Sequence, residues 1–278
     1  MTTDYKLIER LLEGMEHAPV SPTTLSKIAT SLGLDPSLCE LVLQRWAGVG
    51  AEDFLWSQSV DFFVRQLRLS NRLLERKVPQ GLTTTIHKAS RSQGSPVLSM
   101  VVSSGGREGL QILYGVHPSP FGPMFLAVSE NAICFLAFLR NPSDQMPLSS
   151  LENAWRGAVF HMEADATASL ARSVFQSNAG MDSPIKLLVR GSAFQIRVWR
   201  RLLDVPAGSV CSYQQLARAV GCPRGARAVG CVVAANPISY LIPCHRVIRN
   251  TGQTGEYRWG AGRKRAMLVW EATRRSGK

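Results

Sequence analysis

Apolar residues in the first quarter of the chain recur three and four positions apart, which is the spacing of one helix face. The pattern predicts a helix over residues 7–15 and two further helices that begin near Ser21 and Asp35. Each of these two residues is a good N-cap followed by proline. Gly33 lies between the second and third helices, so the pair has the shape of a helix-turn-helix. We therefore expect an all-helical domain over residues 1–78.

Residues 79–95 are rich in proline, glycine, serine and threonine, and they predict a linker. Short apolar runs follow, separated by glycine, proline and polar residues. They predict a small antiparallel sheet with strands at residues 97–102, 110–114, 124–128 and 133–139. Two helices are expected next, one within residues 151–160 and one over residues 165–176. The middle part, residues 96–190, shows no cluster of catalytic residue types, so we interpret it as a scaffold.

The last part, residues 191–278, predicts three short helices, over residues 192–203, 214–220 and 226–235. The turn between the second and third makes another helix-turn-helix. The third helix consists of small residues with Arg227 near its start. Readers of the major groove carry long polar side chains, which this helix lacks. Its composition fits either close approach to a minor groove, with Arg227 as the inserted side chain, or a buried core helix.

The charge of the chain is concentrated in that last part. The net charge is +12, and residues 191–278 hold 15 lysine or arginine residues against 3 acidic residues. Such a concentration indicates a surface for a polyanion, above all nucleic acid, although a basic surface kept for solubility would look the same. A second basic stripe is predicted on one helix face, at Arg65, Arg68, Arg72 and Arg76. This stripe is as compatible with a solvated helix as with DNA binding.

Composition excludes several classes of protein. With 45% hydrophobic and 19% charged residues the chain can bury a core, so it is not a mostly disordered protein. Its longest apolar run, Ala132 to Leu139, is far shorter than the roughly 20 residues of a membrane span. The six cysteines include no CxxC pair, so we expect free thiols and no zinc site. These features predict a cytoplasmic protein.

The densest chemistry lies at Cys244, which is flanked by Pro243, His245 and Arg246. Positive neighbours favour the thiolate form of a cysteine. Adjacent side chains diverge, however, so we expect His245 to reach the sulfur through a bridging water. Convergence of Cys211, Cys222, Cys231 and His245 on a metal ion would require irregular spacings, and it is the weaker interpretation.

The sequence around Cys244 resembles the O6-alkylguanine-DNA alkyltransferases, the methylated-DNA–[protein]-cysteine S-methyltransferases. The resemblance rests on the stretch 243–247 (PCHRV), preceded by Asn236-Pro237 and by residues 227–230 (RAVG). It also includes residues 212–217 (SYQQLA) and 257–260 (YRWG), the latter typical of the bacterial Ada type. It extends across residues 191–278. Residues 120–128 match more loosely, and the N-terminal part resembles a single AraC-type helix-turn-helix without the four-cysteine zinc domain of Ada-like regulators.

The resemblance implies a fold and a set of roles. The fold is α/β plus all-α: the helical module, a small ribonuclease H-like α/β domain over residues 96–190, and a winged-helix-like alkyltransferase domain over residues 191–278. In the family pattern, Cys244 accepts the alkyl group, His245 draws off its proton through water, and Glu271 holds that histidine. Tyr257 matches the tyrosine that donates a hydrogen bond to the base, and Asn236 matches the hinge asparagine.

The same resemblance implies a DNA interface made by Tyr213, Arg227, Ala228, Gly230, Cys231 and Arg246. Arg227 matches the arginine that fills the space left by a flipped nucleotide, and Tyr213 matches the tyrosine that rotates the phosphate. A thiol inside a protein cannot reach guanine O6 within a duplex, so the nucleotide has to be extruded.

The function implied is DNA repair by a single transfer of a methyl or other alkyl group from guanine O6, and from thymine O4, to Cys244. We expect a monomer that needs no cofactor and binds double-stranded DNA containing O6-alkylguanine. The alternative is an Ada-like transcriptional regulator in which the alkyltransferase part is a sensor. In either case the N-terminal helices are expected to bind promoter DNA or a protein partner.

Overall fold

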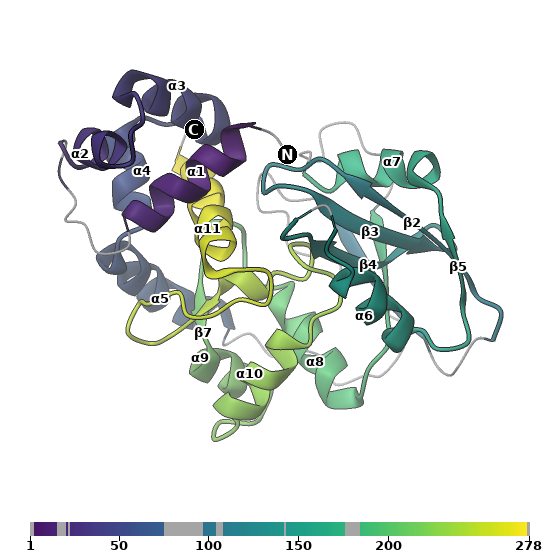
Figure 1. Ribbon diagram of the computed structural model, residues 1–278. Helices are drawn as coiled ribbons and strands as arrows, with labels where there is room; N and C mark the ends of the chain where they lie inside the picture. The colour runs from purple at the N-terminus through teal and green to yellow at the C-terminus, as the bar shows by residue number, and fades with distance from the viewer. Residues whose placement is uncertain are drawn as a thin grey trace.

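The computed structural model describes residues 3–15, 21, 23–74, 97–103, 108–141, 143–175 and 184–276 (Figure 1). The predicted linker, residues 79–95, lies outside the described residues, as do Pro22 and Arg76. Within the described part no helix has both the length and the apolar composition that a membrane crossing requires.

The N-terminal part is helical, as the apolar spacing predicts. Its helices are α1 (Thr3–Gly14), α2 (Thr24–Ser31), α3 (Pro36–Ala47), α4 (Ala51–Ser57) and α5 (Val60–Leu74). The Asp35 cap is confirmed, because its carboxylate accepts hydrogen bonds from the backbone of Ser37 and Leu38. The predicted start at Ser21 is wrong: α2 begins at Thr24, since the Ser21 carbonyl accepts from the Thr24 amide in a turn that precedes the helix.

The middle part contains a six-stranded sheet with the order β1-β6-β4-β3-β2-β5. The strands are β1 (Leu98–Val102), β2 (Gln111–His117), β3 (Met124–Ser129), β4 (Ala132–Phe138), β5 (Val159–Met162) and β6 (Ile185–Val189). The four predicted strands are present, but the prediction of an antiparallel sheet is wrong. Only β2, β3 and β4 pair antiparallel, whereas β1–β6, β4–β6 and β2–β5 are parallel.

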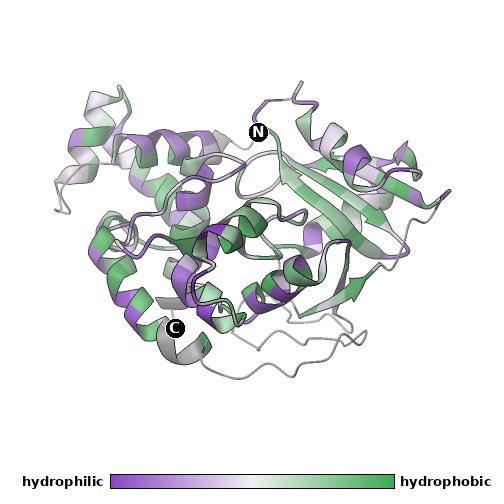
Figure 2. Ribbon diagram, turned by 90° about the horizontal axis from the view of Figure 1, so that it is seen from below, coloured by the Kyte–Doolittle hydropathy of each residue, from purple (hydrophilic) through white to green (hydrophobic). Residues whose placement is uncertain are grey.

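The helices of the middle part are α6 (Met146–Ala154) and α7 (Ala164–Ser173). The helix expected within residues 151–160 is also wrong in its extent. It begins earlier, with Pro147 in its first turn, and residues 159–162 form β5 because their backbone pairs with β2. Every residue of β3 and β4 is buried, and these strands carry mainly hydrophobic residues in Figure 2.

The last part contains α8 (Ala193–Leu202), β7 (Cys211–Ser212), α9 (Tyr213–Ala219), α10 (Ala226–Ala234), the short 3₁₀ helix η1 (Cys244–Arg246), β8 (Val247–Ile248) and α11 (Ala261–Ser276). The three predicted helices occupy their predicted places to within two residues. Ser192 and Ser212 cap α8 and α9, and each forms a reciprocal capping box with the glutamine three residues later.

The N-terminal helices and the rest of the chain share one hydrophobic core. Helices α1, α3 and α4 all pack on α11, as Figure 1 shows. Trp46 donates from its indole nitrogen to the Pro120 carbonyl at 2.8 Å, and Arg265 donates to the Leu12 carbonyl at 2.7 Å. The helical part is therefore fixed to the sheet and to α11 by buried contacts.

Helix α7 packs closely on β2 at Gly115. A Cβ at this glycine would lie 2.6 Å from the Ala164 Cα and 2.8 Å from the Thr167 hydroxyl, so the two elements would have to separate. We expect Gly115→Ala to lower the free energy of unfolding by about 1–3 kcal/mol, as overpacking does. Urea unfolding measures the change.

Gly262→Ala is the matched control. Position 262 is in the first turn of α11, and the nearest atom to an added Cβ is the Glu9 Cγ at 3.7 Å, an ordinary contact. This variant should be as stable as the unmodified chain or slightly more stable. Equal stability of the two variants would show that the β2–α7 contact is not tight.

Candidate active site and DNA-binding face

Asn236 organises the segment that carries Cys244. This buried residue follows α10, and its Oδ1 accepts from the Ile238 amide at 3.0 Å. Its Nδ2 donates to the Ile242 carbonyl at 2.8 Å and lies 3.0 Å from the Cys244 Sγ. Strand β4 holds the same segment from the other side, because Leu136 exchanges backbone hydrogen bonds with residues 237 and 239. One amide thus fixes both the turn and the sulfur.

The Cys244 thiol is 5% exposed, and its sulfur lies 4.0 Å from the Tyr257 hydroxyl. Burial raises the pKa of Cys244 above its ordinary value, and this effect outweighs the hydrogen bond from Asn236, that with Tyr257 and the positive charge of Lys264, which favour the thiolate. The expectation of a thiolate favoured by the flanking residues is therefore corrected: at neutral pH the resting group is a thiol. Any reaction as a nucleophile has to remove its proton.

His245 and Glu271 form a buried pair next to this cysteine. The His245 Nε2 lies 2.9 Å from the Glu271 Oε1, and both side chains are almost completely buried. Burial lowers the pKa of His245, so the ring is neutral at pH 7 and donates from Nε2 to the carboxylate. The His245 Nδ1 is then an acceptor, and it is buried without a hydrogen-bond partner among the described residues. An acceptor of this kind fits a base that works through a bridging water.

Tyr240 supports the imidazole of His245 from one face. The two rings are stacked, with centroids 5.6 Å apart and planes inclined by 5°. Tyr240 has a φ of +65°, a left-handed backbone conformation that is strained for a bulky residue. Its ring also packs against Phe121, Phe175 and Trp270, which hold it in place.

Arg246 is the third partner of Glu271. Its Nη2 and Nε donate to the two carboxylate oxygens at 2.7 and 2.9 Å, and its Nη1 donates to the Val205 carbonyl. The Gly208 amide completes the set at 3.2 Å. These positive neighbours lower the pKa of Glu271 from 4.5 to about 2, despite full burial. The prediction that Arg246 contacts DNA is therefore corrected: its guanidinium is buried and is bonded to Glu271 and to the Val205 carbonyl.

Tyr257 and Ser239 form the other wall of the site. Their hydroxyls are 2.5 Å apart, and the Tyr257 hydroxyl also lies 3.8 Å from the Met267 sulfur. Sequence reasoning singled out Tyr257 but missed Ser239, Tyr240 and Lys264. The Lys264 Nζ is buried and donates to the Val247 carbonyl at 2.7 Å, and burial lowers its pKa to about 8. The signal available for Lys264 was its spacing, because it lies two turns before Glu271 on the same face of α11.

Most of the DNA contacts predicted from the sequence lie on one face of α10. Arg227, Ala228 and Cys231 are exposed, whereas Val229, Val232 and Val233 are buried. Gly230 lies under the Tyr213 ring, since a Cβ there would be 3.7 Å from the Tyr213 Cδ1. The helix is therefore neither wholly buried nor lined by long polar side chains. It presents a smooth outer face with one arginine.

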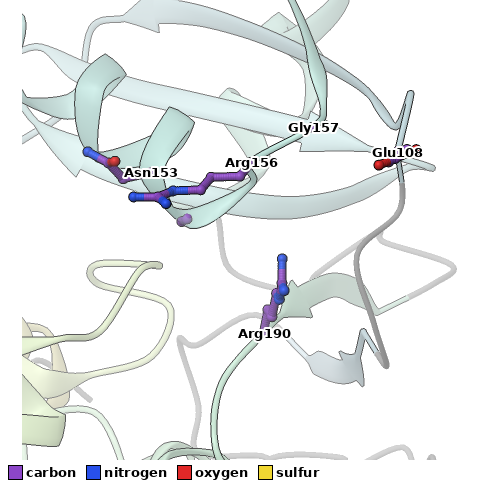
Figure 3. Close-up of a pocket in the computed structure, with 6 residues that line it drawn as sticks. Glu108, Asn153, Arg156, Gly157 and Arg190 are labelled. Atoms are coloured by element: carbon purple, nitrogen blue, oxygen red, sulfur yellow. The ribbon is translucent and has the colours of Figure 1, made fainter.

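A cavity of about 590 Å³ lies elsewhere, on the sheet part of the molecule (Figure 3). It is lined by Glu108, Asn153, Ala154, Arg156, Gly157 and Arg190. None of the residues around Cys244 contributes to it. Nor do the described residues contain three histidine, cysteine or acidic side chains grouped so that they could hold a metal ion.

The site combines a buried thiol, a buried histidine–carboxylate pair that begins at the next residue, and a helix of small residues with an exposed face. Residues 193–273 match the family model described as 6-O-methylguanine DNA methyltransferase, DNA binding domain. The bifunctional transcriptional activator/DNA repair enzyme Ada of Escherichia coli is 32% identical over 268 residues, 91% of this chain and 71% of that protein. The chain belongs to the family of methylated-DNA–protein-cysteine methyltransferases.

Shorter relatives match a little over half of this chain. The methylated-DNA–protein-cysteine methyltransferase of Mycobacterium tuberculosis is 34% identical over 165 residues, 59% of this chain and 94% of that protein. A crystal structure of the O6-methylguanine methyltransferase of the same organism covers 59% of this chain and 94% of its own, with a TM-score of 0.48 and 32% identity.

The hydrogen bonds of Glu271 generate a prediction about stability. Glu271→Gln leaves the Arg246 guanidinium buried without its counter-charge, so we expect the free energy of unfolding at pH 7 to fall by about 3–5 kcal/mol. Because the folded pKa is depressed, the carboxylate stabilises the fold fully above pH 4.5. This contribution, about 3 kcal/mol, is lost as the pH falls towards 2.

Urea unfolding at pH 7 and at pH 3 tests both parts. The unmodified chain should lose stability over this range, and the Glu271→Gln variant should lose less. Glu152→Gln removes an exposed acid and is the control, with a profile like that of the unmodified chain. Identical pH profiles for the unmodified chain and Glu271→Gln would mean that this carboxylate is not the anion holding the site together.

Proposed function

We propose that this protein repairs alkylated DNA by moving a methyl or small alkyl group from guanine O6 to the Cys244 Sγ, once per molecule. The observation that carries the proposal is the His245 Nδ1, a buried acceptor without a partner in the described structure, on a ring that is fixed by Glu271 and belongs to the residue directly after Cys244. Membership of the methyltransferase family supports the same reaction.

The chemistry balances without a further reactant. The Cys244 proton passes through a water to the His245 Nδ1, and the sulfur attacks the alkyl carbon. The carbon–sulfur bond forms as the carbon–O6 bond breaks, and the bond electrons remain with the guanine. Guanine takes up one proton through water and leaves neutral, with the Tyr257 hydroxyl as a hydrogen-bond donor to the base, and His245 returns the thiol proton to water, so that the protons balance. Because a thioether does not release its alkyl group, Cys244 is consumed.

Glu271 has an electrostatic role in this scheme. His245 becomes positive when it accepts the proton, and burial opposes a positive charge. The Glu271 carboxylate stays ionised because Arg246 and His245 lower its pKa, so it stabilises the imidazolium. Arg246 is thus a positioning residue for Glu271 and not a DNA contact.

We infer that DNA lies across α9 and α10 and that the damaged nucleotide is rotated into the site. Arg227, Ala228, Gly230 and Cys231 form the approach of α10 to the minor groove, and Tyr213 lies beside them. The absence of bulky side chains on this outer face supports close approach, and Arg227 has the length to fill a vacated stack. We propose the alkylated O4 of thymine, a smaller base than guanine, as a second target.

The domain types also belong to the proposal. Residues 96–190 are assigned as ribonuclease H-like and residues 191–278 as winged-helix-like, with β7 and β8 beside the helix pair. The alternative function, a regulator that reads promoter DNA, is less well supported. Helix α3 exposes Leu38 and Leu41 together with Glu40, and Arg45 pairs with Asp4, so its outer face offers few groups for bases or phosphates.

Mass spectrometry tests the transfer. After incubation with a duplex containing O6-methylguanine, the protein should gain one methyl group in place of one proton, located on the peptide with Cys244. Cys244→Ala should bind the duplex and gain nothing, whereas Cys231→Ala, the exposed thiol on α10, should still be methylated at position 244. A methyl group on the Cys244→Ala variant would refute the assignment.

The role of Arg227 gives a separate prediction. Arg227→Ala should slow methyl transfer from a duplex about tenfold or more, because extruding a base costs a few kcal/mol and 1.4 kcal/mol is a factor of ten. Transfer from a single-stranded oligonucleotide should change much less. Single-turnover rates on the two substrates measure the difference, with Arg172→Ala on α7 as the control for loss of an exposed positive charge. Equal slowing on both substrates would contradict a role in extrusion.

A further inference from the structure

Helix α5 belongs to the N-terminal part in sequence, but part of its buried face packs on the alkyltransferase part. Phe63 and Leu67 form a small hydrophobic cluster with Val210, Ile248 and Leu268. Val210 directly precedes β7, Ile248 ends β8, and Leu268 lies in α11. In Figure 1, α5 lies alongside β7 and α9. The arginine stripe seen in the sequence is therefore carried by a helix that is fixed next to the proposed DNA-binding helices.

A hydrogen bond connects α5 to the first turn of α9. The Gln215 Nε2 donates to the Leu67 carbonyl at 2.9 Å. The Oε1 of the same side chain accepts from the Ser212 amide at 2.7 Å, as part of the capping box of α9. Tyr213, the proposed phosphate-rotating residue, lies between these two residues. One side chain thus connects α5 to the first turn of α9, which begins with Tyr213.

The loop that follows the active site connects α5 to the same tyrosine. At Gly252 the loop packs directly on α5, since a Cβ there would lie 2.9 Å from the Val60 carbonyl and 2.9 Å from the Val64 Cγ2. Arg249, at the start of this loop, is exposed, and its positive charge is near enough to the Tyr213 hydroxyl to act on it. The loop therefore joins Tyr213 to α5.

Arg65 and Arg68 are exposed on α5 next to that loop. Arg68 lies one helical turn after Val64, on the side of α5 that contacts Gly252, and Arg65 is adjacent. No ion pair among the described residues involves either guanidinium. The loop that carries Arg249 thus joins Tyr213, beside α10, to the helix that carries these two arginines.

We propose that α5 is an extension of the repair surface: Arg65 and Arg68 bind backbone phosphates of the duplex that lies on α9 and α10, on one side of the damaged nucleotide. The proposal rests on the proposed function, because it assigns a second part of the chain to the same DNA. The contact is independent of sequence, since guanidinium groups on phosphates position a duplex without reading bases. It gives the N-terminal helices a role in DNA repair other than recognition of a promoter.

The size of α5 sets the scale of the experiment. Fifteen residues at about 1.5 Å each extend about 22 Å, which corresponds to about six base pairs at about 3.4 Å each. A duplex whose arms on both sides of O6-methylguanine are only a few base pairs long should therefore not extend far enough to contact α5. Duplexes extended by about ten base pairs on one side should reach it, and only one of the two possible extensions should do so.

The test compares affinities of the full chain for these duplexes by fluorescence anisotropy over a range of salt concentrations. For the unmodified chain, one extension should strengthen binding and the other should not. In the double variant Arg65→Gln, Arg68→Gln this gain should disappear, and the slope of log affinity against log salt should become shallower by about two. The variant Arg65→Lys, Arg68→Lys should retain the gain because it keeps both charges.

A matched loss of two charges provides the control. Arg156→Gln with Arg172→Gln removes two exposed arginines on the sheet part. For this variant, the difference in affinity between the two extended duplexes should equal that of the unmodified chain. If the glutamine variant of α5 retains the gain from one duplex arm and the salt slope, α5 is not part of the DNA-binding surface. The two arginines then serve another purpose, such as binding an acidic protein partner. If the unmodified chain takes no methyl group from any duplex, the proposed function itself fails, which is a separate result.

Discussion

The site depends on one buried carboxylate. Glu271 accepts four hydrogen bonds, from His245, from two nitrogens of Arg246 and from the Gly208 amide. A buried anion is tolerated only when it is paired and hydrogen-bonded to this degree. In return it connects three regions: the C-terminal helix, the segment that carries the reactive sulfur, and the turn before β7. The same hydrogen bonds therefore orient the imidazole and hold these three regions of the fold together.

This arrangement explains why the reactive group is a thiol at rest. Burial raises the pKa of Cys244 by more than the positive charge of Lys264 lowers it, and Arg246 is already paired with the Glu271 carboxylate. The Asn236 amide donates to the sulfur but adds no net charge. A protected thiol that becomes nucleophilic only when a neighbouring base removes its proton suits a group that can react once, because stray reactions would waste the protein.

The sequence predicts some features better than others, and the reasons are physical. Helices α8, α9 and α10 follow from local signals, namely the caps Ser192 and Ser212 and the proline after Asn236. Strands β5 and β6 are short and find their partners far along the chain, so no local pattern reveals their parallel pairing. At the site, Asn236 and Tyr257 contact the Cys244 sulfur, and Glu271 bonds to His245, the next residue along the chain. All of these residues carry recognisable chemistry. The direction of Arg246 and the roles of Ser239 and Tyr240 depend on tertiary contacts, which the sequence does not display.

The backbone of Tyr240 carries a consequence for the middle part of the molecule. Its left-handed conformation is unfavourable by about 1–3 kcal/mol and persists only where the surroundings compensate. Two of the rings that do so, Phe121 and Phe175, belong to the part of the chain that otherwise looks like a passive framework. Side chains from the middle part therefore help to orient the imidazole that we propose as the base. Loosening that aromatic cluster would tilt the imidazole although every residue of the proposed site is still present.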